Sequence, residues 1–338
     1  MNGPARRREL TGVALVLAGL LSAALAQPAA AGPAQPLALE RKIPLGEIRG
    51  RIDHLAIDLD RDRLFVAELG NHSLGVMDLA AGKVLRRIDG LEEPQGVAYD
   101  PATDTVYVAD GGDGSVHRFK GAELTPLAPV ELGSDADNVR LDPEAGHVVV
   151  GYGDGALALI SAASGELEAQ IRLPGHPESF QLEHAGRRIF VNVPDAHQIT
   201  VMDQATRRQV ASWSIGGADA NFPMVLDEPD GRLLTVYREP PLLAVFDTDS
   251  GTPVAQLPAC GDTDDLFLDA RRQRVYLSCG AGYLDVFARR GDVYRSLARV
   301  PTVPGARTSL YVPERDRLYL AVRASGSEGA AVWVFRPA

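Results

Sequence analysis

The sequence predicts an all-β protein folded as a seven-bladed β-propeller, and two observations lead to this prediction. A pattern of short apolar strands separated by turn residues recurs seven times after residue 37. The last repeat lacks an outer strand, while one extra strand precedes the first repeat. A recurring unit of several strands is typical of propeller blades, because each small sheet must bury both faces against its neighbours.

The repeat is clearest in residues 95–110, QGVAYDPATDTVYVAD, where apolar residues alternate with small or polar ones around the turn DPAT. This pattern predicts a β-hairpin. Successive repeats are 41 to 44 residues apart when aligned on the residue that ends their first strand. These residues are Asp58, Asp100, Asp142, Glu183, Asp227, Asp269 and, at the seventh place, Pro313.

Each repeat supplies its strands in a fixed order. The first strands are HLAID, GVAYD, NVRLD, SFQLE, PMVLD, DLFLD and SLYVP. Second and third strands follow, such as RLFVA and SLGVMD, and they are rich in β-branched and aromatic residues. Fourth strands such as KVLRRI complete every repeat except the seventh. Residues 37–45, LALERKIPL, are therefore predicted to pair with the last blade and close the ring, which removes the open sheet edges.

The pattern xVAxDPxxxxVYVAxxxxxxVxVxDxxxG resembles the YVTN-type repeat of YncE-like seven-bladed propellers and covers the chain after residue 37. VYVAD and DGGDGSV are more weakly similar to NHL and gluconolactonase-like repeats. The YncE-like resemblance implies the fold and no catalytic residue. The gluconolactonase-like resemblance implies a metal site in the channel with Glu, Asn and Asp as ligands. In this sequence Asn138 could be the Asn ligand, and Asp264 or Asp265 the Asp ligand. The chain departs from that family near the first blade, where Asp53-His54 stands in place of the Glu-Gly-Pro that supplies the family's acidic ligand, and this departure counts against lactone hydrolysis.

The N-terminus has the features of an export signal. Three arginines precede an apolar run at residues 10–25, and Ala24-Leu25-Ala26 matches a cleavage site. We expect a signal peptide at 1–26, a flexible Ala/Pro-rich leader at 27–36 and a single propeller domain at 37–338. This predicts a periplasmic or secreted protein without a membrane anchor in the mature chain. Either the general or the twin-arginine export route fits.

The mature chain is acidic. Removing residues 1–26 takes away three Arg and one Glu, which lowers the net charge from −11 to −13. Nucleic-acid binding needs a basic surface, so we expect no nucleic-acid partner. Motifs for haem attachment, nucleotide phosphates and a nucleophilic serine elbow are absent, and two tryptophans are too few for the repeated tryptophan docking of quinone-dependent propellers.

Candidate site residues come from the loops that lead into the first strands, because strand ends from all blades converge there around the channel. The pairs at the seven strand entrances are Asp53-His54, Gln95-Gly96, Asp137-Asn138, Glu178-Ser179, Phe222-Pro223, Asp264-Asp265 and Thr308-Ser309. The predicted ligand-binding residues are Asp53, His54, Asp137, Asn138, His176, Glu178, Asn221, Phe222, Asp264, Asp265, Arg307 and Thr308. No catalytic residue is assigned.

Converging carboxylates raise one another's pKa unless they share a cation or a proton. Asp53, His54, Asp137 and Asp264 are therefore candidate metal ligands. Oxygen ligands favour Ca²⁺ or Mg²⁺, and His54 also allows Zn²⁺, Mn²⁺ or Cu²⁺. In the alternative interpretation, these residues bind loop N–H groups or pair with the three arginines Arg51, Arg140 and Arg307.

Cys260 and Cys279 both fall in the sixth repeat, one before its first strand and one at the end of its second. Antiparallel pairing would bring them to one face, and an oxidising compartment favours a disulfide. Two free thiols, or soft-metal ligands near Asp264 and His54, are the alternatives.

These observations predict a monomeric binding or scaffold protein that holds a small molecule, a metal ion or a protein partner at this face. The alternative function is a divalent-metal-dependent hydrolase of the gluconolactonase type. Asp264, Asp265 or Glu178 would then act as its base.

Overall fold

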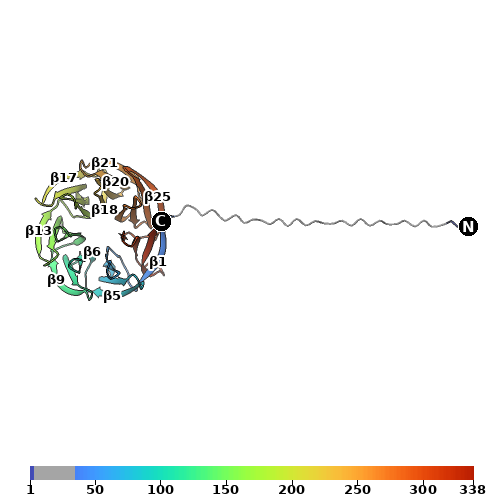
Figure 1. Cartoon of the computed structure of the whole chain (residues 1–338), viewed down its shortest axis with the longest axis horizontal. Coiled ribbons are helices and arrows are strands. Elements are labelled where there is room, and N and C mark those ends of the chain that lie inside the picture. Colours follow the sequence, from blue (N-terminus) through green and yellow to red (C-terminus); the bar gives the residue numbers. More distant parts are fainter. Residues whose placement is uncertain (4–34) are drawn as a thin grey trace. The chain divides into compact units, whose positions relative to one another are not determined.

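The repeated strands form seven four-stranded antiparallel sheets arranged as a ring (Figure 1). The computed structural model describes residues 1–3 and 35–338. Most of the predicted signal peptide and most of the predicted leader lie outside the described residues. The described residues include no helix with the length and hydropathy of a membrane span.

Blades one to four follow the order of the sequence from the channel outward. Blade one consists of β2 (Leu55–Asp58), β3 (Arg63–Glu68), β4 (Ser73–Asp78) and β5 (Lys83–Asp89). Blade two consists of β6 (Pro94–Asp100), β7 (Thr105–Asp110), β8 (Ser115–Lys120) and β9 (Thr125–Glu131). Blade three consists of β10 (Ala136–Asp142), β11 (His147–Tyr152), β12 (Ala156–Ser161) and β13 (Leu167–Arg172). Blade four consists of β14 (Phe180–Leu182), β15 (Arg188–Val193), β16 (Gln198–Asp203) and β17 (Arg208–Ser214).

Blades five and six repeat this order. Blade five consists of β18 (Asp219–Asp227), β19 (Arg232–Glu239), β20 (Pro241–Asp247) and β21 (Pro253–Pro258). Blade six consists of β22 (Thr263–Asp269), β23 (Arg274–Cys279), β24 (Tyr283–Arg290) and β25 (Val293–Pro301). Two single-turn 3₁₀ helices, η1 (Leu69–Asn71) and η2 (Pro194–Ala196), lie between the second and third strands of blades one and four.

Blade seven confirms the predicted closure of the ring. It contains β26 (Ser309–Val312), β27 (Arg317–Val322) and β28 (Ala330–Pro337), and its outer strand is β1 (Leu37–Gly46). The register of β1 on β28 runs from Leu37 opposite Pro337 to Gly46 opposite Ala330. The first and last strands of the chain, β1 and β28, therefore pair in one sheet. Blade seven thus has four strands, like the other six blades.

Buried apolar side chains fill every junction between neighbouring blades. At the junction of blades three and four, for example, Val149 and Leu157 pack with Phe180 and Val191. Strands that are buried on both faces need apolar residues on both faces, which explains the near-continuous apolar second strands. The cores thus lie between sheets, and the central channel is left for other side chains.

The acidic residue that ends the first strand of a blade is a turn residue. Asp58 accepts hydrogen bonds from the N–H groups of Asp60 and Arg61 at 3.1 and 3.0 Å, and Asp100 binds its turn similarly. Arg61 also reaches Asp104 of the next blade at 2.8 Å. The residue on which the repeats align therefore organises the turns at the end of the ring opposite the candidate site.

Candidate ligand site at the channel mouth

A polar cavity of about 250 Å³ lies where the first strands of the blades begin. From the predicted ligand-binding set it is lined by Asp53, His54, Asp137, Asn138, His176, Glu178, Phe222, Asp264 and Arg307. Four further residues line it that were outside the predicted set: Arg51, Gln95, Asp135 and Arg238. Side chains from blades one to seven thus meet around one space, which we call the mouth cavity.

Two of the carboxylates in the mouth cavity are held by arginines. Asp53 pairs with Arg51 at 2.5 Å. Asp264 accepts from Arg238 and from Arg307, both at 2.9 Å. For these two carboxylates the alternative interpretation, pairing with neighbouring arginines, describes the structure.

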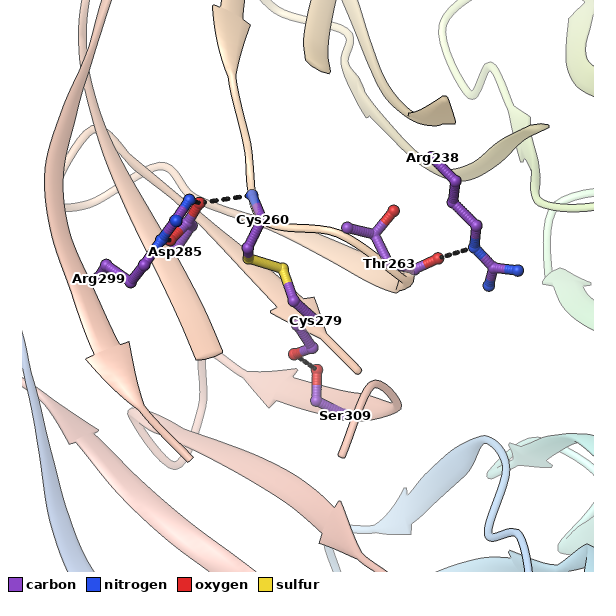
Figure 2. The surroundings of a disulfide bond; sticks show 8 residues. Arg238, Cys260, Thr263, Cys279, Asp285, Arg299 and Ser309 are labelled. Atoms are coloured by element: carbon purple, nitrogen blue, oxygen red, sulfur yellow. Dashed lines mark hydrogen bonds and ion pairs between the residues drawn. A yellow bond between two sulfur atoms is a disulfide. The ribbon is translucent and has the colours of Figure 1, made fainter. Parts of the chain in front are cut away.

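Arg238 comes from the end of β19 and stacks on the Phe222 ring, with 3.6 Å between its guanidinium carbon and the ring centroid. Its Nε donates to the main-chain oxygen of Thr263 in the next blade, as Figure 2 shows. Arg238 and Phe222 together form a flat wall of the mouth cavity.

His54 lies between two carboxylates. Its Nε2 is 3.8 Å from Asp53 and its Nδ1 is 3.5 Å from Asp265. Burial alone would lower the pKa of His54, but Asp265, Asp53 and Asp137 outweigh it and raise the pKa to about 10. The imidazole is therefore protonated at neutral pH, and a protonated ring has no lone pair to offer a metal.

Asp137 and Glu178 have no such support. Within the described residues neither carboxylate has a hydrogen-bond or ion-pair partner, although Asp137 is only 9% exposed. Burial and neighbouring carboxylates raise the pKa of Asp137 to about 6 and that of Glu178 to about 9. Burial and Asp53 also raise the pKa of Asp264 to about 6, against the opposing effect of its arginines.

Asn138 adds a third oxygen of this kind. The residue is 4% exposed, it lines the mouth cavity, and its Oδ1 has no hydrogen-bond partner in the described chain. Leaving a buried polar atom unsatisfied costs free energy, so such atoms are rare in folded proteins. Asp137 and Glu178 thus line the cavity with carboxylates that no group of the described chain pairs, and Asn138 stands beside them with a buried Oδ1 that also lacks a partner.

The remaining predicted residues have mainly structural contacts. Asn221 is fully buried and donates to Asn192 at 2.8 Å and to the main chain of Gln198 at 3.2 Å. Thr308 donates to the main-chain oxygen of Ile52 at 3.3 Å. The Nδ1 of His176 lies 2.6 Å from the carbonyl of Gly153, at the rim of the cavity.

Gly96 is the one entrance residue whose lack of a side chain matters. A Cβ at this position would lie 2.0 Å from the main-chain oxygen of Asp137. Glycine at the second blade therefore lets the first strand of the third blade approach closely. This close approach places Asp137 and Asn138 beside the channel.

The two cysteines form the predicted disulfide, with their Cα atoms 5.9 Å apart (Figure 2). The bond joins the loop before β22 to the end of β23, and both residues are buried. The N–H of Cys260 donates to Asp285 at 2.8 Å. The disulfide thus fixes the segment that leads to Asp262 and Asp264, the two partners of Arg307.

The described residues contain one group of carboxylate and imidazole atoms close enough to share a metal ion, namely Asp110, Asp113 and His117. The oxygens of Asp110 already accept from the N–H groups of Glu92, Glu93 and Gly112 at 2.7 to 3.0 Å. This group therefore ties two loops of blade two together. The predicted metal set of Asp53, His54, Asp137 and Asp264 does not form such a group.

Comparisons with known proteins agree with the fold. The family model described as Arylesterase matches residues 69–163, less than a third of the chain. No curated protein matches the sequence. The mouth residues Asp137 and Asn138 fall inside the matched segment, whereas Glu178 and Asp264 fall outside it.

Several solved structures are similar over most of their length. Hydrazine synthase of Kuenenia stuttgartiensis superposes with a TM-score of 0.72 at 16% identity, covering 83% of this chain and 97% of that one. A chain of the mitotic checkpoint complex gives 0.73 at 13% identity, with 94% and 98% covered. The WD40 repeats of RRP9 give 0.75 at 10% identity, with 88% and 96% covered. At these identities the likeness establishes the propeller fold alone.

Proposed function

We propose that this protein is an exported, monomeric binding protein that holds a small cation at the mouth cavity. The observation that carries the proposal is that the carboxylates of Asp137 and Glu178 line one cavity without a hydrogen-bond or ion-pair partner among the described residues, beside Asn138, whose buried Oδ1 lacks a partner as well. Carboxylate and amide oxygens are the ligands that Ca²⁺ prefers. The resemblance of the repeats to YncE-like propellers, whose motif implies no catalytic residue, agrees with a binding role.

The other mouth residues fit a supporting part in this proposal. Asp53 and Asp264 are neutralised by arginines, and His54 is protonated, so the electrostatic need for a cation is greatest at Asp137 and Glu178. A bound cation would favour the ionised form of both carboxylates. Of the sequence-predicted metal set, Asp137 is thus the ligand that the contacts favour.

Melting of the purified protein tests this proposal. After chelator treatment, the wild type should melt at a higher temperature when Ca²⁺ is added, because a ligand of the native state stabilises it by mass action. Mn²⁺, Zn²⁺ and Cu²⁺ are compared at equal concentration. Asp137→Asn and Glu178→Gln should lose most of the shift, while the exposed Glu166→Gln should keep it. If none of these ions shifts the wild type, or if both mouth variants respond like the wild type, the proposal fails.

Ester or lactone hydrolysis is the second candidate, and the partial Arylesterase match is the observation in its favour. A bound divalent cation would polarise an ester carbonyl. Two of the residues suggested as a base fit this poorly, because Glu178 would itself be a ligand of the cation and Asp264 is held by two arginines. Turnover of phenyl acetate or a γ-lactone that disappears in Asp137→Asn would favour hydrolysis over binding alone.

A further inference from the structure

A second cavity, of about 390 Å³, occupies the channel below the mouth cavity, and we call it the lower channel. The two cavities share His54 and Asp264. The walls of the lower channel are mostly apolar and include Leu55, Val97, Val139, Met224, Leu266 and Phe267. Its volume falls in the range of sites that hold small organic molecules.

The charged groups of the lower channel leave one guanidinium without a counter-ion. Asp264 is paired with two arginines, and Asp265 is paired with His54 and accepts from the N–H of Ser309 at 2.7 Å. Arg140 donates only to neutral oxygens, the main chain of Val139 at 2.9 Å and the hydroxyl of Ser179 at 3.3 Å. Among the described residues no carboxylate forms an ion pair with Arg140.

Arg140 is exceptional among the seven blades. It is the third residue of the first-strand segment NVRLD, and the other segments place uncharged residues at this position: Ala56, Ala98, Gln181, Val225, Phe267 and Tyr311. Burial lowers the pKa of Arg140, although Asp265 and Asp137 oppose this effect. The side chain is half-buried, and its guanidinium carbon lies 5.6 Å from the centroid of the Phe180 ring. A guanidinium remains charged in proteins, and a partly buried charge without an ion-pair partner loses hydration that no opposite charge replaces. The fold therefore bears an electrostatic cost here that an anionic ligand would relieve.

We infer that the lower channel binds a small organic anion, a monocarboxylate with a short hydrocarbon body, whose carboxylate pairs with Arg140. The planar guanidinium can donate two parallel hydrogen bonds to a carboxylate. The hydrocarbon body would lie against the apolar walls of the channel. This site is distinct from the cation site of the mouth cavity, since it uses another residue and a ligand of opposite charge.

The lower channel is open to such a ligand. Ile57, Tyr99, Leu141, Val225 and Leu310 line it and are each half-buried, and the first three stand one residue before the strand ends that lie opposite the mouth. A ligand can thus enter without displacing the ion pairs of the mouth cavity. Occupation of the lower channel then does not depend on occupation of the mouth.

A series of ligands tests the inference on the wild-type protein in the presence of chelator. Acetate, butanoate and hexanoate are added at increasing concentrations, and the melting temperature is measured at each. Hexanamide is the uncharged control for hexanoate. We expect hexanoate to bind more tightly than acetate, because it buries more apolar surface, and hexanamide to cause no shift. If hexanoate causes no shift, or if hexanamide shifts the melting temperature equally, the inference is overturned.

Variants locate the site. Arg140→Gln should weaken hexanoate binding at least tenfold, whereas Arg295→Gln, at an exposed position of the outer strand β25, should bind like the wild type. Unchanged hexanoate binding in a folded Arg140→Gln protein contradicts the inference. Asp137→Asn, which removes a mouth carboxylate, should retain hexanoate binding. Failure of the cation proposal and failure of this inference are therefore distinguishable.

Discussion

The raised pKa values of Asp137 and Glu178 lower the stability of the folded protein at neutral pH. Their pKa values, about 6 and about 9, mean that the native state favours the protonated acids more than the unfolded chain does. For Glu178, both states are protonated below about pH 4, where the residue costs nothing. As the pH rises from there toward 9, the unfolded state gains by ionising and the native state does not. Stability is therefore lost progressively across this interval.

Glu178→Gln should remove this loss. In chelator at pH 8, we expect the variant to melt about 2–4 °C above the wild type, the shift that about 1 kcal/mol produces in a large domain. At pH 4 the two proteins should melt alike, because the wild-type carboxyl is then neutral. Melting curves at several pH values measure the effect. A variant that is less stable than the wild type at pH 8 would show that the Glu178 carboxylate supports the fold.

At the scale of elements, the loops that enter the first strands determine the site. The loop before β22 is anchored by the disulfide at Cys260; it carries Asp262 and leads directly to Asp264 in β22, and both carboxylates pair with Arg307. Since β22 begins at Thr263, a shift of this loop would move Asp264 away from Arg238 as well. The arrangement of the mouth arginines thus depends on a covalent bond outside the cavity.

Replacing both cysteines by alanine should lower the free energy of unfolding by roughly 3 kcal/mol, the chain-entropy value for a loop of this length. Alanine is chosen because both cysteines are buried. Chemical denaturation of the variant and of the reduced wild type should give similar midpoints, both below that of the oxidised protein. Two titratable thiols in the unreduced wild type would contradict the bond.

Much of the fold is predictable from the sequence because the strands are local and repeated. The hairpin expected around Asp100 pairs Val97 with Val108 and Tyr99 with Val106, as the alternation implies. Side-chain pairing in the mouth is not local. Arg238 enters from the end of a second strand, and whether Arg140 or Arg307 meets a carboxylate depends on side-chain conformations that spacing does not reveal. The sequence therefore indicates which residues surround the channel but not which of them are left unpaired.

At the scale of the whole molecule, stability depends on closing the ring. β1 is the outer strand of blade seven, and Leu37, Ile43 and Leu45 are buried in the clusters at its two junctions. Burial of three such side chains contributes roughly 5–9 kcal/mol. This is comparable to the whole free energy of unfolding of a typical domain.

A chain that begins at Glu47, and so lacks β1, should fail to fold cooperatively or should aggregate through the exposed edge of β28. A chain that begins at Gln35 keeps β1 and is the matched control, which should melt like the full-length protein. Melting and size-exclusion chromatography of the two chains make the comparison. A soluble monomer with an unchanged melting temperature after the longer deletion would contradict closure by β1.

The central claim, a cation held by Asp137, Asn138 and Glu178, is tested most directly by calorimetric titration of Ca²⁺ into chelator-treated protein at pH 7.5. The titration is run in Tris and in HEPES, two buffers that differ in their heat of protonation. Because Glu178 is protonated at this pH, binding should show one site per chain and release of about one proton, visible as a difference in heat between the buffers. Asp137→Asn should weaken or abolish the binding. The absence of any binding heat in both buffers, or binding that is unchanged in Asp137→Asn, would contradict the claim.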